Sequence, residues 1–142
     1  MTASASPRRS AELVAPELAP YLDGGDTNTL LMPRCQGCGR LQWPPRPHCA
    51  TCGAGSFAPT SIRATGALYS WTTTHAALAP EFAHLIPYTV VIVTLDVPER
   101  LRFIGRLQET NTVPELHIGA RMSAAWDRDT HRTPLLLWKV DA

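Results

Sequence analysis

Apolar and polar residues alternate along most of the second half of the chain, which is the pattern of strands with one buried face. Residues 88–96 are rich in β-branched side chains and are apolar on both faces, as a central strand requires. In residues 101–107 the pattern places Arg102, Ile104 and Arg106 on one face, so that face carries two cations. Strands are predicted over residues 67–74, 88–96, 101–107, 120–126 and 133–140.

The order and spacing of these strands favour a small closed barrel. The longest connection without a strand pattern lies between the third and fourth strands, as in a five-stranded Greek-key barrel of the OB type. Gly105, in the middle of the third strand, fits a bend or bulge of the kind that such a barrel needs. An open five-stranded meander or a sandwich fragment fits the same pattern. The chain is therefore predicted to be mainly β, with an OB-fold domain over residues 59–142.

The first part of the chain lacks this alternation. Residues 1–10 are small, polar and basic and lack the apolar surface that ordering requires, so we expect a flexible tail. Over residues 11–33 apolar side chains recur near helical spacing, but Pro16 and Pro20 limit any helix to short turns. A short helical segment of this kind needs a surface to lie on, either this protein's own sheet or a partner.

The four cysteines fall in two short motifs, Cys35-Gln36-Gly37-Cys38-Gly39 and Cys49-Ala50-Thr51-Cys52-Gly53. Two thiolates separated by two residues reach one tetrahedral ion, and a second pair completes the ligand shell. The glycine after each motif suits a tight turn with positive φ. This spacing predicts a zinc ribbon over residues 34–58, in which a structural zinc is bound by Cys35, Cys38, Cys49 and Cys52.

Other interpretations of the cysteines were weighed against this one. Two disulfides would need an oxidising compartment, and residues 1–10 contain no apolar run that would serve as a secretory signal. Iron in place of zinc fits the same four thiolates. His48 lies next to Cys49 and is a possible substitute ligand, but with four thiols available we expect it to face solvent.

Composition narrows the functional classes. The chain has 142 residues with 44% hydrophobic content, enough for one modest core and too short for two large domains. Thirteen basic and twelve acidic side chains give a formal charge of +1, so no overall field attracts a polyanion. The longest apolar run, residues 90–93, is far too short to cross a bilayer. We therefore expect a cytoplasmic protein, with neither nucleic acid nor membrane as a favoured partner.

The order of the motifs is typical of a known family. Cys-x-x-Cys-Gly is followed by Trp-Pro-Pro-Arg and a second Cys-x-x-Cys-Gly, and later come Tyr-Ser-Trp-Thr, Pro-Tyr and Ile-Gly. Over most of its length the chain resembles domain-of-unknown-function family thirty-five, in which a rubredoxin-like zinc ribbon precedes an OB-fold. The matching positions are Cys35, Cys38, Gly39, Trp43, Pro44, Pro45, Arg46, Cys49, Cys52, Gly53, Gly66, Tyr69, Thr72, Pro87, Tyr88, Leu95, Ile118 and Gly119.

The resemblance implies association with an enzyme rather than catalysis. Members of the family accompany thiolases, thiolase-like aldolases, hydroxymethylglutaryl-CoA synthases or enoyl-CoA hydratases, and they look like acyl-CoA-binding subunits. By this resemblance the chain is a non-catalytic accessory subunit in lipid, sterol side-chain or polyketide metabolism. Its N-terminal segment and ribbon would meet the partner enzyme, and its barrel would help to form a tunnel for CoA or its acyl group.

Three arginines are candidates for contacts with the phosphates of CoA. Arg46 stands on a loop stiffened by prolines, whereas Arg102 and Arg106 stand on the exposed face of a predicted strand. Arginines on a strand face are also ordinary solvated charges that discourage pairing at sheet edges. Arg46 is therefore the preferred candidate of the three.

Four apolar residues are candidates for contact with a partner or an acyl chain. Residues 74–87 form a loop that is too apolar to be left free in solvent. We expect Leu78, Phe82 and the neighbouring Tyr88 to be covered by the barrel itself, an acyl chain or a partner subunit. Trp43, between the cysteine motifs, either packs over the metal module or meets the partner.

No set of residues matches a known catalytic pattern. Four metal-bound thiolates leave neither a cysteine nucleophile nor an open coordination position for a substrate, so we expect no autonomous catalysis. The alternative function is a nucleic-acid-binding OB module in which Tyr69, Trp71 and Phe103 stack on bases. The near-neutral charge and the alternation of these aromatics favour a place in the core instead.

Overall fold

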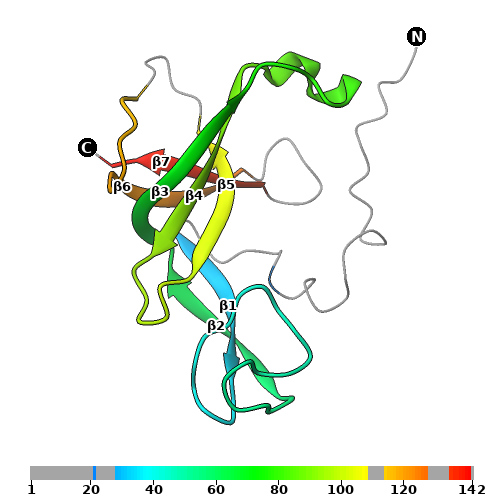
Figure 1. The fold of residues 1–142 in the computed structure, drawn as a ribbon, viewed down its shortest axis with the longest axis vertical. Coiled ribbons are helices and arrows are strands. Elements are labelled where there is room, and N and C mark those ends of the chain that lie inside the picture. Colours follow the sequence, from blue (N-terminus) through cyan, green and yellow to red (C-terminus); the bar gives the residue numbers. More distant parts are fainter. Residues whose placement is uncertain (1–20, 22–27, 109–113, 128–134, 142) are drawn as a thin grey trace.

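The computed structural model describes residues 21, 28–108, 114–127 and 135–141. Figure 1 shows a two-stranded ribbon at one end of the molecule, a barrel in the middle and the short 3-10 helix η2 at the opposite end. The described elements are β1 (Thr29–Cys35), β2 (Phe57–Arg63), β3 (Thr65–Thr74), η2 (Pro80–Leu85), β4 (Tyr88–Leu95), β5 (Arg102–Leu107), β6 (Arg121–Asp127) and β7 (Leu135–Val140). The described segments contain no helix long and apolar enough to span a membrane.

The ribbon is built from the antiparallel pair β1 and β2, which runs from Thr29 opposite Arg63 to Cys35 opposite Phe57. The helical prediction for residues 11–33 is therefore wrong over residues 29–33. These residues alternate in burial and pair with β2, so the tertiary partner overrides the weak helical spacing. Apart from Tyr21 and Asn28, the rest of that segment and the predicted tail over residues 1–10 lie outside the described residues.

The predicted domain boundaries fall inside strands. The ribbon was expected over residues 34–58, but β1 begins at Thr29 and β2 continues to Arg63. Only one residue, Ala64, then separates β2 from the first barrel strand. Because the cysteines mark only the tip of the ribbon, the sequence motif could not show how far its strands extend.

The barrel is closed, with the strand order β3-β4-β5-β7-β6 and a return from β6 to β3. All of its pairs are antiparallel except β5 with β7, where Arg106 lies opposite Leu137 and Leu107 opposite Trp138. This crossed order is the five-stranded Greek key of the OB-fold. The predicted barrel is confirmed, and the alternative of an open meander is excluded by the closure.

The barrel contains a bulge in β3 and a close contact between the backbone of Gly105 and the Trp138 ring. The bulge lies in β3, where the register with β4 shifts between Leu68 and Ser70. A bend or bulge was predicted at Gly105, and the bulge is wrong, because the pairing of β5 with β4 is regular there. A Cβ atom at Gly105 would lie 2.6 Å from Cδ1 and 2.7 Å from Nε1 of Trp138. Glycine is needed at this position because the indole ring packs directly on the β5 backbone.

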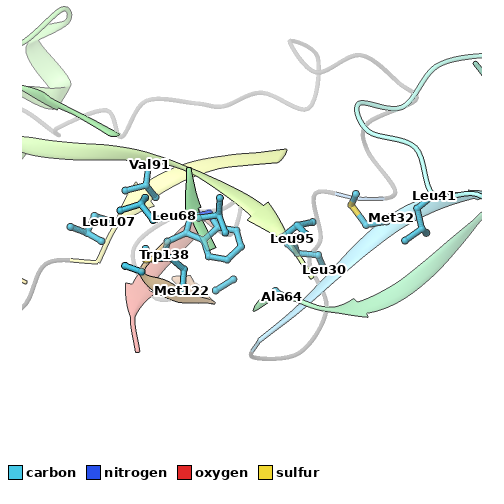
Figure 2. Close-up of a cluster of buried hydrophobic side chains, with 13 residues drawn as sticks. Leu30, Met32, Leu41, Ala64, Leu68, Val91, Leu95, Leu107, Met122 and Trp138 are labelled. Carbon is cyan, nitrogen blue, oxygen red and sulfur yellow. The ribbon is translucent and has the colours of Figure 1, made fainter. Parts of the chain in front are cut away.

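A single hydrophobic core runs from the barrel into the ribbon. Trp138 is fully buried at the centre of the barrel, and Leu30 and Met32 of β1 belong to the same cluster of buried side chains (Figure 2). The ribbon thus shares the core of the barrel, since the inward residues of β1 extend it.

Hydrogen bonds also join the ribbon to the barrel. The indole N–H of Trp126 on β6 donates to the carbonyl of Thr29 at 2.9 Å. Ala64 donates to the carbonyl of Asn28, and its own carbonyl accepts from Ala124 of β6. The residue between β2 and β3 is thus fixed on both sides, so the two parts are held in a defined orientation.

Candidate metal centre

The four cysteine sulfurs converge at the tip of the ribbon, all within 4.8 Å of one another. The sulfurs of Cys35 and Cys52 lie 3.5 Å apart, and those of Cys38 and Cys49 lie 3.7 Å apart. Four thiolates placed about 2.3 Å from one zinc ion at tetrahedral angles are separated by roughly 3.8 Å. The observed separations are close to that value, so the donor set fits one tetrahedral zinc.

Each cysteine motif folds into the same tight turn. The N–H of Gly39 donates to the carbonyl of Cys35, and the N–H of Gly53 donates to the carbonyl of Cys49, both at 2.9 Å. Gly39 has a φ of 77° and Gly53 a φ of 78°, a backbone conformation that glycine adopts at little cost. The predicted function of these two glycines is confirmed.

Backbone N–H groups inside the turns point at the sulfurs. Gly37 donates to Sγ of Cys35 at 3.3 Å, and Thr51 donates to Sγ of Cys49 at 3.4 Å. Such bonds favour the thiolate over the thiol, because they place partial positive charge beside the sulfur. Both turns are therefore preorganised to bind a cation through sulfur.

Without a bound cation, neighbouring thiols of the cluster differ in pKa. Hydrogen bonding from backbone N–H groups, first that of Cys52, lowers the pKa of Cys49 to about 6. The N–H of Ala54 also lowers the pKa of Cys52, but the neighbouring thiols, Cys35 first, and burial together raise it to about 11. A divalent cation removes this difference in protonation, since it binds all four sulfurs as thiolates. A closed shell of four thiolates has no open position for substrate, so the zinc is structural.

His48 takes no part in this shell. Its side chain is exposed, and no group that could hold a metal within the described residues includes it. Its carbonyl accepts a hydrogen bond from Nε2 of Gln42, while Oε1 of the same glutamine accepts from the N–H of Ala50. The position next to Cys49 is therefore part of a hydrogen-bonded loop.

The loop between the two motifs packs against the barrel. Trp43 is half-buried, and its ring lies 4.5 Å from the ring of Phe103 on β5, measured between centroids. On another side it makes an edge contact with Tyr21 at 6.4 Å. Packing is therefore one function of Trp43, but against the barrel and the N-terminal segment rather than over the metal alone.

A cleft of about 270 Å³ lies where this loop meets the barrel. Its walls include Trp43, Arg46 and Glu99, so Arg46 is the one predicted phosphate contact that faces a cleft. Oε1 of Glu99 accepts the N–H of Leu41 at 3.1 Å, whereas its Oε2 is buried and has no hydrogen-bond partner among the described residues. Glu99 thus connects the β4–β5 turn to the ribbon. Because 58 residues separate Glu99 from Leu41, no local sequence pattern indicates this contact.

Arg102 and Arg106 lie away from that cleft, on the outward side of β5. The guanidinium carbon of Arg102 lies 3.7 Å from the centroid of the Tyr69 ring, a cation–π contact that spans from β5 to β3. Tyr69 is 45% exposed and Trp71 is 39% exposed. The expectation that these two aromatics belong to the core is therefore wrong, because the inward residue of this part of β3 is Leu68 and the Trp71 ring, although opposite Val91, stays partly in solvent.

Leu78, Phe82 and Tyr88 lie on the hairpin arm, which we define as residues 71–91 of β3, η2 and β4. Leu78 is 88% exposed, Phe82 in η2 is half-buried, and Tyr88 begins β4 opposite Thr74. The arm extends from the end of the barrel opposite the ribbon (Figure 1). The structure thus separates the predicted site residues into the metal centre, the cleft lined by Trp43 and Arg46, the outward side of β5 and the hairpin arm.

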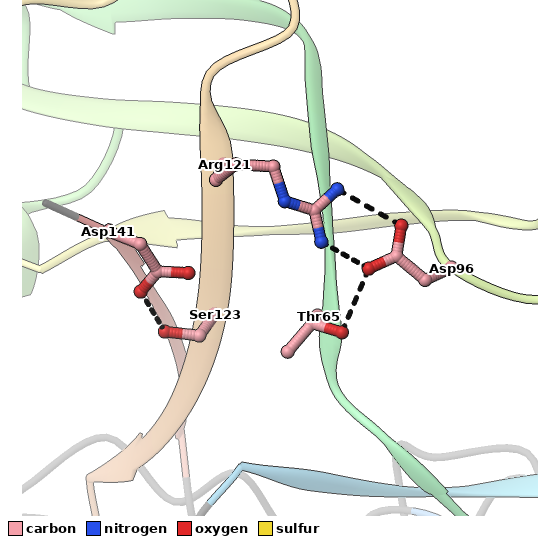
Figure 3. A network of polar contacts seen from close by, with 5 residues as sticks. All are labelled: Thr65, Asp96, Arg121, Ser123 and Asp141. Carbon is pink, nitrogen blue, oxygen red and sulfur yellow. Dashed lines mark hydrogen bonds and ion pairs between the residues drawn. The ribbon is translucent and has the colours of Figure 1, made fainter.

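A polar network closes the seam between β3 and β6. Asp96 accepts two hydrogen bonds from the guanidinium of Arg121 and one from the hydroxyl of Thr65 at 2.9 Å (Figure 3). Arg121, first by direct hydrogen bonding, lowers the pKa of Asp96. Ser123 donates to Asp141 nearby at 2.6 Å. No local sequence pattern indicates this network, because Thr65, Asp96 and Arg121 are far apart along the chain.

Two family models match the chain, one over the ribbon and one over the barrel. Residues 22–58 match a family model described as "ChsH2, rubredoxin-like zinc ribbon domain". Residues 61–127 match the model "ChsH2, C-terminal OB-fold domain". The two matches together cover well over half of the chain. The chain belongs to the ChsH2 family.

Two curated relatives and one solved structure extend this assignment. A "probable enoyl-CoA hydratase alpha subunit" of Thermomonospora curvata is 31% identical over 81 residues, which are 57% of this chain and 25% of that protein. A "DUF35 domain-containing scaffold protein" of Methanocaldococcus jannaschii is 26% identical over 96 residues, which are 67% of this chain and 65% of that protein. The matched part thus spans less than two thirds of either relative. The resemblance to family thirty-five is confirmed.

The solved structure covers almost the whole chain. A protein titled "Ltp2-ChsH2(DUF35) aldolase" superposes with a TM-score of 0.75 at 25% identity. The match covers 90% of this chain and 97% of that one. The ribbon-plus-barrel arrangement is therefore shared with a protein whose title names an aldolase together with ChsH2.

Proposed function

We propose that this chain is a non-catalytic accessory subunit that docks on an acyl-CoA-processing enzyme of the thiolase-fold or hydratase type. The observation that supports this most is the match over 90% of the chain to a structure titled as an aldolase with ChsH2. A relative named as a scaffold protein and another named as a hydratase subunit agree with it. In such an assembly the chain would help to form the substrate site rather than react with the substrate.

The exposed apolar side chains are consistent with docking. Leu78 at the end of the hairpin arm is almost fully exposed, and large exposed apolar residues commonly mark contact sites. We place Leu78, Phe82 and Tyr88 in contact with the partner or the acyl chain. Trp43 would contribute on the ribbon side, where it already packs between the loop and β5.

Binding of acyl-CoA by this chain is the finer part of the proposal. Arg46 faces a cleft whose wall includes the aromatic ring of Trp43, which suits a phosphate-bearing group. Arg102 and Arg106 also carry the charge that a phosphate needs, but they lie on an open strand face rather than in this cleft. Arg46 is therefore the first residue to test. The zinc holds the loop that carries it, and the protein would act in the cytoplasm.

The test is reconstitution with candidate enzymes. The full chain is mixed with thiolase-fold and hydratase-type enzymes from the same genome, and the mass of any complex is measured by size-exclusion chromatography with light scattering. We expect one of these enzymes to form a stoichiometric complex whose turnover of an acyl-CoA substrate exceeds that of the enzyme alone. Failure of every candidate to bind or to change its turnover would reject the accessory function.

The CoA contact is tested separately by calorimetry on that complex. Arg46→Ala should weaken the binding of CoA by about tenfold, the loss typical of one charge-assisted contact. His48→Ala, an exposed change on the same loop, serves as the control and should leave the affinity unchanged. Equal affinities for the Arg46→Ala variant and the native chain would remove Arg46 from the CoA site.

Nucleic-acid binding remains as a second candidate because of one observation. Tyr69 and Trp71 are exposed on the barrel, and Arg102 stacks on the first of them, which is the kind of surface on which OB-folds stack bases. The formal charge of +1 argues against it. Salt-dependent binding of a single-stranded oligonucleotide, measured by fluorescence anisotropy, would favour this candidate over the accessory subunit.

A further inference from the structure

Within the described residues, the side chains on the outward side of the three-stranded sheet β3-β4-β5 are exposed or half-buried. We call this surface the outer face. Residues directly opposite each other in antiparallel strands point to the same side of a sheet, and here the rows alternate with the buried Val91 and Val93. The register places Ile92, Arg102, Ile104 and Arg106 on the outer face, and Tyr69, which has no partner in the β3–β4 pairing, joins them through its ring contact with Arg102.

The centre of the outer face is apolar and exposed. Ile104 is 61% exposed, although it lies in the middle of β5 opposite Ile92. Tyr69 adds a large ring beside it. Residues of these types, aromatic and aliphatic groups flanked by arginine, are enriched at the centres of protein interfaces. A β-branched residue so exposed in mid-strand is better explained by a covering partner than by the needs of the barrel.

The charges of the outer face are of one sign. Arg102 and Arg106 stand on either side of Ile104, and within the described residues neither makes an ion pair. The guanidinium of Arg102 is held in place by the Tyr69 ring, which leaves its N–H groups without hydrogen-bond acceptors in the described part of the chain. Nε of Arg106 is buried and also has no acceptor there. The guanidinium of Arg102 is therefore available to an acceptor group from outside, and Arg106 adds a second positive charge to the same face.

This charge pattern decides between the possible occupants. A second copy of the same face would bring four arginines together around one apolar centre, and like charges at an interface are strongly disfavoured. A partner whose apolar patch carries carboxylates matches the face instead. Arg102 and Arg106 are four residues apart on one strand, so the matching carboxylates would be roughly 13 Å apart at about 3.3 Å per residue.

An adjoining cleft extends the outer face. It has a volume of about 440 Å³ and is lined by Tyr69, Arg100 and Ile118 among others. Ile118 is 66% exposed, and Asp96 at the edge of the cleft is already paired with Arg121. The cleft thus offers room for an apolar side chain of the partner, and its one aspartate is neutralised.

We infer that the outer face is the surface by which this chain binds its partner enzyme, through an apolar patch on that enzyme bordered by carboxylates. The inference rests on the proposed accessory function and adds the surface and its chemistry. It places the interface on the barrel, in addition to the ribbon and N-terminal segment that the family resemblance implies. Arginine–carboxylate pairs set the orientation, and Ile104 and Tyr69 supply the apolar contact.

The test uses the enzyme that forms a complex with the native full chain. The double variant Arg102→Glu, Arg106→Glu reverses both charges and should raise the dissociation constant at least about tenfold, because each glutamate would face a carboxylate. Salt screens the attraction in the native complex and the repulsion in the variant complex. The difference between their dissociation constants should therefore shrink as the salt concentration is raised. Affinity is measured by biolayer interferometry at two salt concentrations.

The matched control is the single variant Lys139→Glu on β7, which is compared with the single variant Arg102→Glu. Lys139 is exposed and lies off both the outer face and the ribbon, and the two single variants give the same change in net charge. We expect less than a threefold change in affinity from Lys139→Glu. Because Arg106 is partly buried, Ile104→Glu is measured as well, and thermal unfolding verifies that each variant folds.

The outcomes separate the two proposals. Weak binding by the outer-face variants, with native-like melting and near-native binding by the control, supports the inference. Native affinity in the folded outer-face variants overturns the inference but leaves the accessory function standing. Absence of any complex with the native chain overturns the accessory function, and the outer face then loses its proposed partner as well.

Discussion

The ribbon and the barrel are joined by one core but are stabilised in different ways. The barrel closes through a complete circuit of paired strands around Trp138, which is fully buried. The ribbon has one strand pair, and its tip is two turns whose sulfurs face each other across a few ångströms. Strand pairs of this size are marginal alone, so the tip depends on its ion while the barrel does not. The comparison predicts which changes act locally and which act on the whole molecule.

Loss of a metal ligand should have the largest effect. Cys49→Ala removes one of four thiolates, and structural zinc sites contribute on the order of 10 kcal/mol of binding free energy at neutral pH. We expect stoichiometric zinc to be lost and the ribbon to unfold, as measured by metal analysis and by the fluorescence of Trp43. His48→Ala, next to the ligand and exposed, is the control and should retain one zinc per chain.

A methyl group added at Gly105 should damage the barrel and not the metal site. Its Cβ would lie 2.6 Å from the Trp138 ring and 3.1 Å from the carbonyl oxygen of Leu136, so Gly105→Ala should cost about 1–3 kcal/mol of unfolding free energy. Gly55→Ala in the ribbon is the matched control. Its Cβ would meet only ordinary contacts at 3.5 Å or more. Urea unfolding that shows equal losses for the two would contradict the close-packed view of β5.

Removal of the Glu99 carboxylate should weaken the contact between the barrel and the ribbon. Glu99→Ala leaves the N–H of Leu41 without its acceptor, which should cost about 1–2 kcal/mol. Glu99→Gln keeps an oxygen for that bond and should cost less. Hydrogen exchange of the Leu41 amide, measured by NMR, distinguishes the two variants; faster exchange in both would mean that the charge, rather than the hydrogen bond, matters.

Acid should weaken the barrel seam by a small amount. Because Arg121 lowers the pKa of Asp96 below its unfolded value, its contribution to stability is present above the unfolded pKa. That contribution is lost as the pH falls through the lowered folded pKa. Both side chains are about half exposed, so the effect should be only about 0.5 kcal/mol. Asp96→Asn should show the loss already at neutral pH in thermal melts, and its stability should change less than that of the native chain in acid.

The sequence predicted the parts of the fold that local patterns encode. Alternation located the five barrel strands, because each has a buried face, and cysteine spacing located the metal ligands. The strands of the ribbon were missed because Leu30 and Met32 bury their side chains in a core that belongs mostly to the barrel. The residues next to Leu30 and Met32 in the sequence give no indication of this core.

The contacts that join distant elements were also beyond the sequence. Glu99 binds Leu41 across 58 residues, and Arg102 stacks on Tyr69 from the other side of β4. The bulge in β3 lies between Leu68 and Ser70, where no residue type indicates it, whereas Gly105 lies in a regularly paired part of β5. Site chemistry carried by short motifs can thus be read from the sequence, whereas surfaces assembled from several strands need the fold.

Hydrogen exchange of the full chain with and without zinc tests the central contrast most directly. We predict that removal of the ion abolishes protection of the turns around Cys35–Gly39 and Cys49–Gly53 and lowers it in β1 and β2, while the amides of β4 and β7 around Trp138 stay protected. Loss of protection throughout the barrel at the same zinc concentration, or full protection of the two turns without any metal, would contradict the account.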